Sequence, residues 1–248
     1  MAAIRPLDGS VCLVTGGGRG IGKASALAFA RAGASVVVAA RSREQLDEVV
    51  QEIGELGGTA MAIEADVTSG EDCHAMVKRT AAEFGRLDVL LANAGGGLTE
   101  GRLVDSDPQE WTRTIALNLT SLFHCCQAAV PIMAGQRAGK ILLMGSGIGH
   151  APTPGASAYA AAKAGASQLV RVLAQEVWRL GIDVNEVVPG PVATELTKSH
   201  FTPGQAPQMA KSERVKHPDE VAELVTWLAT RPTAGPTGQT FSLARRPL

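Results

Sequence analysis

The stretch Thr15-Gly-Gly-Gly-Arg-Gly-Ile-Gly22 follows an apolar run, Val11 to Val14, and leads directly into a segment of helical period. Glycine lets a backbone turn sharply, and the N-terminus of the helix that follows stabilises the negative charge of a pyrophosphate. Glycine also serves ordinary strand-to-helix turns, so it is the position between a strand and a helix that favours a dinucleotide site. The residues expected to contact the dinucleotide here are Gly16, Gly18, Arg19, Gly20, Ile21 and Gly22.

Outward from this loop, apolar runs alternate with segments of helical period along the whole chain. Seven runs predict strands, at residues 11–14, 35–40, 60–65, 89–92, 141–144, 182–188 and 239–243. Between them, helices are expected at residues 21–31, 44–56, 71–84, 108–133 and 157–180. Strict alternation of this kind is typical of βαβ units. It predicts an α/β fold, a Rossmann-like doubly wound sheet of seven mainly parallel strands with helices on both faces, in a single domain over residues 1–248.

The end of the second expected strand indicates which dinucleotide binds. A cofactor with free ribose hydroxyls calls for an acidic residue there, whereas a 2′-phosphate calls for an arginine. The sequence reads Ala40-Arg41 and places no carboxylate at this point. Because arginine makes bidentate, charge-assisted contacts to phosphate, Arg41 and Arg19 together favour NADP(H) over NAD(H). The alternative is that such arginines are solvated residues at a helix start, and we prefer it for Arg43.

Two later loops carry weaker cofactor signals. Asp66 and Val67 follow the third strand, where the carboxylate would accept from the adenine amino group or, as an alternative, cap the next turn. Asn93, Ala94 and Gly95 follow the fourth strand, and their small side chains would let a ribose or adenine lie close to the backbone.

A second group of polar residues follows the fifth strand. Tyr159 and Lys163 are four residues apart on an expected helix, so both side chains project from one face. Ser146 lies at the end of the strand before that helix. The three side chains are therefore expected to converge where a nicotinamide would lie.

Taken together, several motifs resemble those of the short-chain dehydrogenase/reductase family. They are the glycine-rich loop, Asn93-Ala-Gly95, Asn118, Ser146, Tyr159-Ala-Ala-Ala-Lys163 and Pro189-Gly190. The resemblance covers nearly the whole chain, and the combination is far more specific than any single motif. Within the family the sequence is most similar to FabG-like carbonyl reductases, a grouping that also includes alcohol, sugar and steroid dehydrogenases.

The resemblance implies a catalytic tetrad of Asn118, Ser146, Tyr159 and Lys163. Tyr159 would donate a proton to the carbonyl oxygen during reduction and accept it back during oxidation. A free tyrosine has a pKa of about 10, so oxidation near neutral pH requires a downward shift of about two to three units. The Lys163 ammonium and the nicotinamide ring would supply it. Ser146 would bind the substrate oxygen, and Asn118 would support a water path to the lysine.

For the cofactor, the resemblance implies contacts from Tyr159 and Lys163 as well, and from the segment after the sixth strand. That segment contributes Pro189, Gly190, Val192 and Thr194, of which Thr194 would contact the nicotinamide carboxamide. The implied function is hydride transfer between NADP(H) and a carbonyl or secondary alcohol, with a 3-oxoacyl thioester as one candidate substrate. The alternatives are an alcohol, sugar or steroid dehydrogenase, or a catalytically silent NADP-binding regulatory module, against which the complete tetrad argues.

Composition excludes several other classes. The formal net charge is -1, with no block of like charge, so a nucleic-acid or membrane-surface role lacks electrostatic support. No apolar run approaches membrane-spanning length, and the N-terminus does not resemble a signal peptide. Cys12, Cys73, Cys125 and Cys126 have no metal-ligand spacing, so no metal site is expected. Apolar surroundings and a reduced, cytoplasmic setting suit them.

Four features depart from the expected pattern or stay open. Residues 192–216 contain prolines and scattered polar residues without a period, and predict a substrate lid with Leu196, Phe201 and Met209 as its apolar part. The strand before Ser146 ends in Gly145 where the family usually has a paired serine. Arg245 and Arg246 replace the family's usual tail, which often helps to form an oligomer. A tetramer or dimer is expected, and the two arginines either take part in its contacts or are solvated. His150 either lines the substrate pocket or is solvated.

Overall fold

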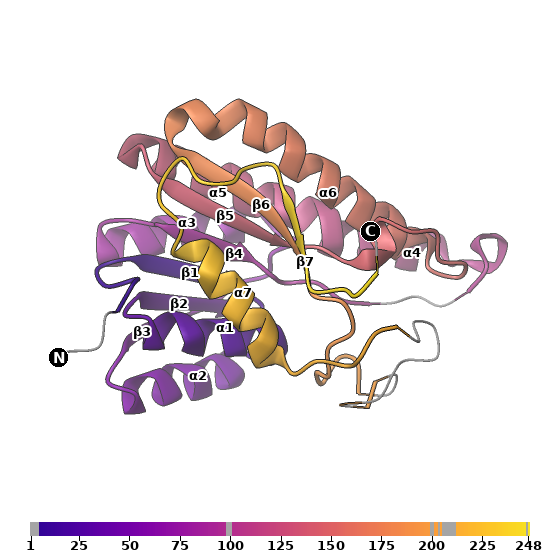
Figure 1. Ribbon diagram of the computed structural model, residues 1–248, viewed down its shortest axis with the longest axis horizontal. Helices are drawn as coiled ribbons and strands as arrows, with labels where there is room; N and C mark the ends of the chain where they lie inside the picture. Colours follow the sequence, from indigo (N-terminus) through magenta and orange to yellow (C-terminus); the bar gives the residue numbers. More distant parts are fainter. Residues whose placement is uncertain (1–4, 98–100, 199–200, 203, 205–211, 247) are drawn as a thin grey trace.

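Seven parallel strands form the centre of the molecule, in the order β3-β2-β1-β4-β5-β6-β7 (Figure 1). The computed structural model describes residues 5–97, 101–198, 201–202, 204, 212–246 and 248. The strands are β1 (Val11–Thr15), β2 (Ser35–Ala40), β3 (Thr59–Glu64), β4 (Val89–Ala92), β5 (Gly139–Met144), β6 (Ile182–Val188) and β7 (Thr240–Ser242). The predicted fold class is confirmed, and each predicted strand is present to within two residues at either end.

Helices cover both faces of this sheet. They are α1 (Gly20–Arg31), α2 (Arg43–Glu55), α3 (Gly70–Phe84), α4 (Pro108–Ile115), α5 (Ser121–Gln136), α6 (Ser157–Val177) and α7 (Pro218–Ala229). One apolar core lies between the sheet and α3, α5 and α6, and contains Met76, Met133 and Val170. The other lies against α1, α2 and α7, and contains Phe29, Leu46 and Val225. The strands read as nearly continuous apolar runs because both faces are buried.

Two helical features differ from the sequence-based expectation. The segment expected as one helix over residues 108–133 is α4, a π-helical turn η2 (Ala116–Thr120) and then α5. Helix α7 was not expected at all. Its start carries clear signals, since Pro218 occupies the first turn and the Glu220 carboxylate accepts from the His217 backbone amide at 2.9 Å. The irregular segment directly before it obscured this start.

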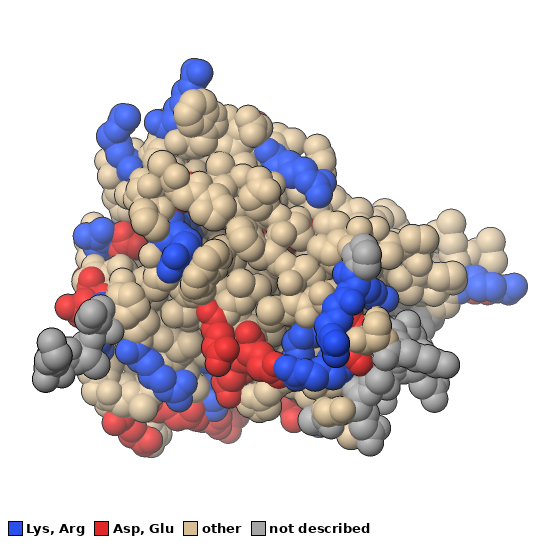
Figure 2. Space-filling view, viewed as in Figure 1, with Lys and Arg blue, Asp and Glu red and all other residues tan. Residues whose placement is uncertain are grey.

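The continuous helical stretch Pro108–Gln136 is long and apolar enough by composition to cross a membrane. This corrects the expectation that no such stretch exists. In the fold it is a core helix, because α5 packs on α3 and buries Leu122, Cys125 and Met133. Charges of both signs are interspersed over the face shown in Figure 2, with neither sign dominating it.

The carboxyl ends of all seven strands lie at one edge of the sheet, because every strand pair is parallel. The chain runs from β1 outward to β2 and β3 on one side and then to β4 through β7 on the other. Ligands of open parallel sheets bind at the carboxyl edge where the strand order reverses, here between β1 and β4. The predicted site residues follow β1 to β6, so the topology brings them to this edge.

Candidate active site

The glycine-rich loop after β1 has the backbone geometry that only glycine adopts readily. Gly16 and Gly20 have φ of 64° and 55°. A Cβ on Gly22 would overlap the carbonyl oxygen of Gly16, and one on Gly18 would lie 2.9 Å from the Gln45 Cβ. These positions therefore have no room for a side chain, and a loop of bare glycine backbone is what a close approach of a pyrophosphate requires.

Helix α1 begins in this loop without a side-chain cap. Its N-cap residue, Arg19, makes no capping hydrogen bond, and the first turn has no acidic residue. By contrast, Ser42, Ser69 and Asp107 each cap the helix that follows them. Free N–H groups at a helix N-terminus attract an anion, so the residues present fit a dinucleotide phosphate.

The two arginines predicted to bind a 2′-phosphate are both exposed, Arg19 at the N-cap of α1 and Arg41 directly after β2. Arg43 instead pairs with Asp47 along α2, at 2.8 Å, and is exposed at the helix start, as expected for a solvated residue. The pKa of Asp66 is lowered, first by the Thr68 backbone N–H and also by the charge of Arg41. Arg41 therefore lies near the loop after β3.

Asp66 performs the turn-capping role that was one of its two alternatives. Its Oδ1 accepts from the Thr68 backbone N–H at 2.9 Å and from the Thr68 hydroxyl at 2.8 Å. Val67 is buried in the core formed by α3, α5 and α6, which leaves only its backbone to face a ligand. The adenine contact of this pair stays a prediction.

Asn93 and Thr15 join the loop after β4 to the glycine-rich loop. The Asn93 side-chain amide donates to the Thr15 carbonyl oxygen at 2.9 Å, and the Thr15 hydroxyl accepts from the backbone N–H of Asn93 at 3.0 Å and of Ala94 at 3.1 Å. A Cβ on Gly16 would meet Ala94 at 3.0 Å. Thr15 had no predicted role, although its place at the end of β1 was an available signal.

Asn118 lies fully buried in the π-helical turn and is bonded to the segment after β4. Its Nδ2 donates to the carbonyl oxygens of Gly96 at 2.8 Å and Thr114 at 3.0 Å, while its Oδ1 accepts from the Gly96 N–H at 3.0 Å. A Cβ on Gly95 would lie 2.9 Å from this Oδ1 and 3.6 Å from Lys163 Nζ. Asn118 and Lys163 therefore approach each other across Gly95.

The predicted pair on α6 lies as its spacing indicated. The Lys163 ammonium is 5.6 Å from the centre of the Tyr159 ring and donates to the Met144 carbonyl oxygen at 2.7 Å. Ser146 follows Met144 by two residues, and its hydroxyl lies close enough to the Tyr159 phenol to lower the pKa of that phenol. All four members of the predicted tetrad are thus brought to one part of the carboxyl edge.

Burial dominates the acidity of both residues on α6. It lowers the pKa of Lys163 to about 8, and the charge of Glu186 partly opposes this change. It raises the pKa of Tyr159 above its usual value, although the nearby Ser146 hydroxyl acts in the other direction. The sequence-based expectation was a lowered pKa for Tyr159, and the protein without cofactor does not produce it. A phenol that keeps its proton is suited to donating it.

The segment after β6 crosses toward the glycine-rich loop. Pro189 is buried, and Gly190 has φ of 68°. A Cβ on Gly20 would lie 3.3 Å from the Thr194 Cγ2, and one on Gly96 would lie 3.1 Å from the Leu196 Cδ2. The predicted lid begins and ends at a parallel β-bridge between Val192 and Lys216. Of its predicted apolar residues, Leu196 and Phe201 are described, whereas Met209 lies outside the described residues.

His150 does not stand free in solvent. Its Nε2 lies 3.1 Å from both carboxylate oxygens of Glu186, a buried residue of β6 that the sequence analysis did not single out. A carboxylate inside the apolar strand Ile182–Val188 was the available signal, because a buried charge requires a partner.

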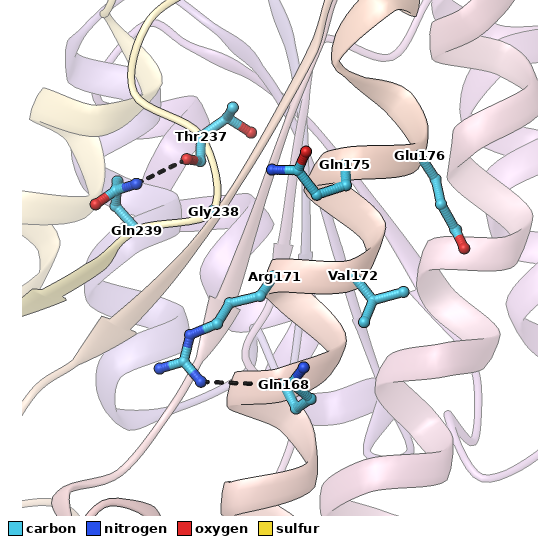
Figure 3. Close-up of a pocket in the computed structure, with 8 residues that line it drawn as sticks. All are labelled: Gln168, Arg171, Val172, Gln175, Glu176, Thr237, Gly238 and Gln239. Atoms are coloured by element: carbon cyan, nitrogen blue, oxygen red, sulfur yellow. Dashed lines mark hydrogen bonds between the residues drawn. The ribbon is translucent and has the colours of Figure 1, made fainter.

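An open hollow of about 590 Å³ lies elsewhere, between α6 and the segment before β7 (Figure 3). Arg171 and Gln168 line it from the helix, and Thr237 and Gln239 from the segment opposite. Because α6 starts at the carboxyl edge of the sheet, these later residues lie toward the opposite edge. The hollow is therefore separate from Tyr159 and Lys163.

Comparisons with known proteins agree with this geometry. A family model described as short chain dehydrogenase matches residues 10–204. A 3-oxoacyl-[acyl-carrier-protein] reductase of Synechocystis sp. is 40% identical over 240 residues, which cover 96% of each chain. A 7alpha-hydroxysteroid dehydrogenase of Escherichia coli is 34% identical over 241 residues, covering 96% of this chain and 94% of that one.

A solved structure has the same fold over nearly the whole chain. A short-chain type dehydrogenase/reductase from Mycobacterium marinum superposes with a TM-score of 0.87 at 33% identity, covering 96% of this chain and 95% of that one. The family model spans most of the sequence, and the relatives cover almost all of it. The protein therefore belongs to the short-chain dehydrogenase/reductase family of oxidoreductases.

Proposed function

We propose that this protein is an NADP(H)-dependent carbonyl reductase that acts on 3-oxoacyl thioesters. The observation that carries the proposal is the convergence of Ser146, Tyr159 and Lys163 at the carboxyl edge of the sheet, the edge at which the uncapped α1 also begins. A 3-oxoacyl-[acyl-carrier-protein] reductase 40% identical to this chain supports the substrate class.

The proposed roles follow from the contacts of each side chain. When bound, the nicotinamide cofactor supplies the hydride that reaches the carbonyl carbon. Ser146 donates a hydrogen bond to the carbonyl oxygen and stabilises the charge that develops there. Tyr159 donates its phenolic proton to the same oxygen, and its raised pKa keeps that proton available. Lys163 places positive charge beside the phenolate that is left, with its Nζ 5.6 Å from the ring centre.

Replacement of Tyr159 by Phe tests the proton-transfer role. Tyr159→Phe keeps the ring that packs beside Lys163 and removes only the hydroxyl, so NADPH binding is expected to stay within about twofold. Turnover is expected to fall by about 100-fold or more, the usual contribution of a general acid. The measurements are NADPH fluorescence titration and the rate of NADPH oxidation. Residual activity above about a tenth of the wild-type rate would remove Tyr159 from this role.

The preference for NADP(H) is proposed from Arg19 and Arg41, both of which are exposed near the glycine-rich loop and the end of β2. Arg41→Asp is expected to weaken NADPH binding by about 1 to 3 kcal/mol, the range for hydrogen bonds to charged groups, and to affect NADH much less. Arg43→Asp is the matched control, because Arg43 already pairs with Asp47 on α2. Equal losses for both cofactors would count against a phosphate contact by Arg41.

The substrate class is tested with a panel of 3-oxoacyl thioesters, simple ketones, sugars and hydroxysteroids, each with both cofactors. A kcat/KM at least about tenfold higher for 3-oxoacyl thioesters would support the proposal, since each factor of ten corresponds to about 1.4 kcal/mol of discrimination. A preference for steroids would favour the activity named for the Escherichia coli relative. Cofactor binding without turnover of any compound would favour a silent regulatory module.

Three further parts of the proposal concern the molecule around the site. Residues 192–216 act as a substrate lid whose two ends are held by the Val192–Lys216 bridge. The chain forms a homo-oligomer, a dimer or tetramer, which is supported by the exposed Trp227, whose ring centre lies 6.1 Å from that of the partly buried Phe241. Light scattering after gel filtration measures the oligomer. The buried free thiols of all four cysteines suit a reducing, cytoplasmic setting.

A further inference from the structure

A buried carboxylate lies directly behind the candidate active site and has no role in the proposed reaction. Glu186 on β6 is 1% exposed. Its Oε2 accepts from the Thr240 hydroxyl on β7 at 2.7 Å, and both of its oxygens lie 3.1 Å from His150 Nε2. Full burial of a carboxylate is costly unless hydrogen bonds and charges compensate it. These two partners and the nearby Lys163 provide that compensation.

His150 belongs to the short loop that carries Ser146. The loop begins after Met144, the last residue of β5, and forms a 3-10 turn over Gly147–Gly149. It then reaches His150, whose backbone N–H donates to the Gly147 carbonyl oxygen at 3.2 Å. Inside the turn, the Ser146 hydroxyl accepts from the Ile148 N–H at 3.3 Å. A contact that holds the His150 ring therefore holds the far end of the serine loop.

The same loop packs against the backbone of Lys163. A Cβ on Gly149 would lie 2.7 Å from the Lys163 carbonyl carbon, so the loop and α6 meet without any side chain between them. The contact between Glu186 and His150 thus fixes the loop that carries Ser146. The same loop packs against α6, the helix that carries Tyr159 and Lys163.

Gly145 provides the space that Glu186 occupies. A Cβ at this position would overlap the Glu186 carboxylate, although the Gly145 N–H still pairs with the Val187 carbonyl oxygen at 2.8 Å. The residue before Ser146 departs from the paired serines that are usual in the family. Its lack of a side chain is accounted for by the carboxylate on the neighbouring strand, so Gly145, Glu186 and His150 form one packed unit.

The charge of Glu186 also reaches the catalytic lysine. The groups that face Lys163 are the Tyr159 ring from its own helix, the Met144 carbonyl from β5, the Glu186 carboxylate from β6 and the Asn118 amide across Gly95. Among these, Glu186 is the anionic group that raises the pKa of Lys163 against the effect of burial. An ammonium that burial would otherwise neutralise is thereby kept charged over a wider pH range.

We propose that Glu186 is a positioning residue for the reaction, which fixes the Ser146 loop through His150 and holds a buried negative charge behind the site. This inference rests on the proposed function for its link to turnover. Its electrostatic half, the effect of the Glu186 charge on the titration of Lys163, is measured directly in the protein without cofactor.

Glu186→Gln keeps the size of the side chain and an oxygen that can accept from His150, but removes the charge. In the cofactor-free protein, NMR of 13C-labelled lysine is expected to show the Lys163 midpoint at a pH about 0.5 to 1 unit below that of the wild type. Asp183→Asn is the matched control. Asp183 is a buried carboxylate of the same strand, but it pairs with Lys140 at 2.8 Å at the opposite end. Asp183→Asn is expected to leave the Lys163 midpoint unchanged.

The link to turnover is measured by pH profiles of kcat and KM. In Glu186→Gln the alkaline limb of kcat is expected to move to lower pH by the same amount, with KM changed by less than about threefold. His150→Leu leaves the carboxylate charge and removes the loop contact. It is expected to lower kcat by about tenfold at all pH values, without moving the limb. In the double variant Gly145→Ser/Glu186→Ala, the serine side chain fills the space left by the carboxylate. This variant is expected to show the same shift of the alkaline limb of kcat as Glu186→Gln.

Two results would overturn the inference. One is that Glu186→Gln and the double variant titrate Lys163 with the same midpoint as the wild type and Asp183→Asn. The other is a His150→Leu enzyme that keeps the wild-type kcat. Failure of the proposed function is a different outcome: the wild type would turn over no member of the substrate panel, while the Lys163 titration would still decide the electrostatic half.

Discussion

Lys163 shows how a single functional residue lowers the stability of the protein. Its side chain is 3% exposed, and burial lowers its pKa to about 8. One pKa unit corresponds to about 1.4 kcal/mol, so holding this ammonium charged at neutral pH costs the folded protein roughly 3 kcal/mol. The Met144 carbonyl oxygen and the Glu186 charge offset only part of the desolvation.

We predict that Lys163→Met raises the free energy of unfolding of the cofactor-free protein by about 1 to 2 kcal/mol near pH 7. The gain is smaller than the full desolvation cost, because the Met144 carbonyl loses its donor. The variant is expected to lose turnover at the same time, since the charge beside Tyr159 is gone. Urea denaturation at about pH 7 measures the change.

The pH dependence of the same variant provides a second check. The folded-state pKa of Lys163 lies below the unfolded value of about 10.4, so the unfolded chain binds more protons between these two values. The wild-type stability therefore gains a contribution from Lys163 as the pH rises from about 8 to 10, and Lys163→Met lacks it. A variant that is less stable than the wild type near pH 7, or that shows the same rise, would contradict this account.

At the residue scale, the sequence predicted partners on one helix better than partners on neighbouring strands. The spacing of Tyr159 and Lys163 defined their shared face, which the structure shows with Nζ beside the ring. The contact of Lys163 with Met144 and the position of Glu186 depend on the register of β5 and β6. The spacing of residues along the chain does not determine the register between strands, and for this reason the Glu186 carboxylate was not predicted.

At the scale of elements, the π-helical turn η2 determines where Asn118 points. Its amide satisfies both the N–H and the carbonyl of Gly96, so it closes the segment after β4 onto the helix. π-helical turns often occur at functional sites. The helical period of residues 108–133 predicted one uninterrupted helix. A single turn with a wider hydrogen-bond ring leaves the apolar pattern nearly unchanged, so the sequence could not reveal it.

We predict that Asn118→Ala lowers the free energy of unfolding by about 1 to 3 kcal/mol, because it leaves buried polar groups of Gly96 and the Thr114 carbonyl without their partner. Ser167→Ala is the control: its Oγ is buried and has no hydrogen-bond partner among the described residues, so its loss should be neutral or stabilising. Equal effects of the two substitutions in urea denaturation would show that the Asn118 bonds do not hold the segment.

At the scale of the whole molecule, the buried Glu213 joins three distant parts of the chain. Its carboxylate accepts from the Arg245 backbone N–H at 3.3 Å and lies 3.7 Å from Lys216 Nζ and 3.6 Å from Arg246 Nε. A Cβ on Gly190 would lie 3.0 Å from the same Nζ. The end of the proposed lid, the C-terminal tail and the loop after β6 therefore meet at one charge cluster.

Alternation of strands and helices was sufficient to predict the layers and the parallel sheet, because right-handed βαβ connections leave few other topologies. The contacts of the tail were beyond such reasoning. The sequence offered no partner within the chain for Arg245 or Arg246, yet the first bonds Glu213 through its backbone N–H and the second lies beside Glu213 with its guanidinium. Only the folded chain brings residues near 213 and 245 together, since no local pattern connects them.

This cluster leads to a prediction for the integrity of the site as a whole. Glu213→Gln removes the negative charge that Lys216 and Arg246 face, and it leaves Lys216, with a side chain 6% exposed, without its counter-charge. Breaking a buried pair from one side is costly, and we expect a loss of about 2 to 4 kcal/mol in the free energy of unfolding. Faster proteolytic cleavage within residues 192–216 should accompany it, because the Val192–Lys216 bridge is the lid's anchor.

The double variant Glu213→Gln/Lys216→Met distinguishes a charge effect from simple loss of packing. Because it removes both buried charges, it should recover at least about half of the stability lost in the single variant. Urea denaturation of the wild type, both single variants and the double variant gives the coupling free energy. Additive losses would mean that Glu213 and Lys216 do not act as a pair. The tail would then be held by the Arg245 backbone and Arg246 contacts alone, and cleavage of residues 192–216 should be unaffected by Lys216→Met.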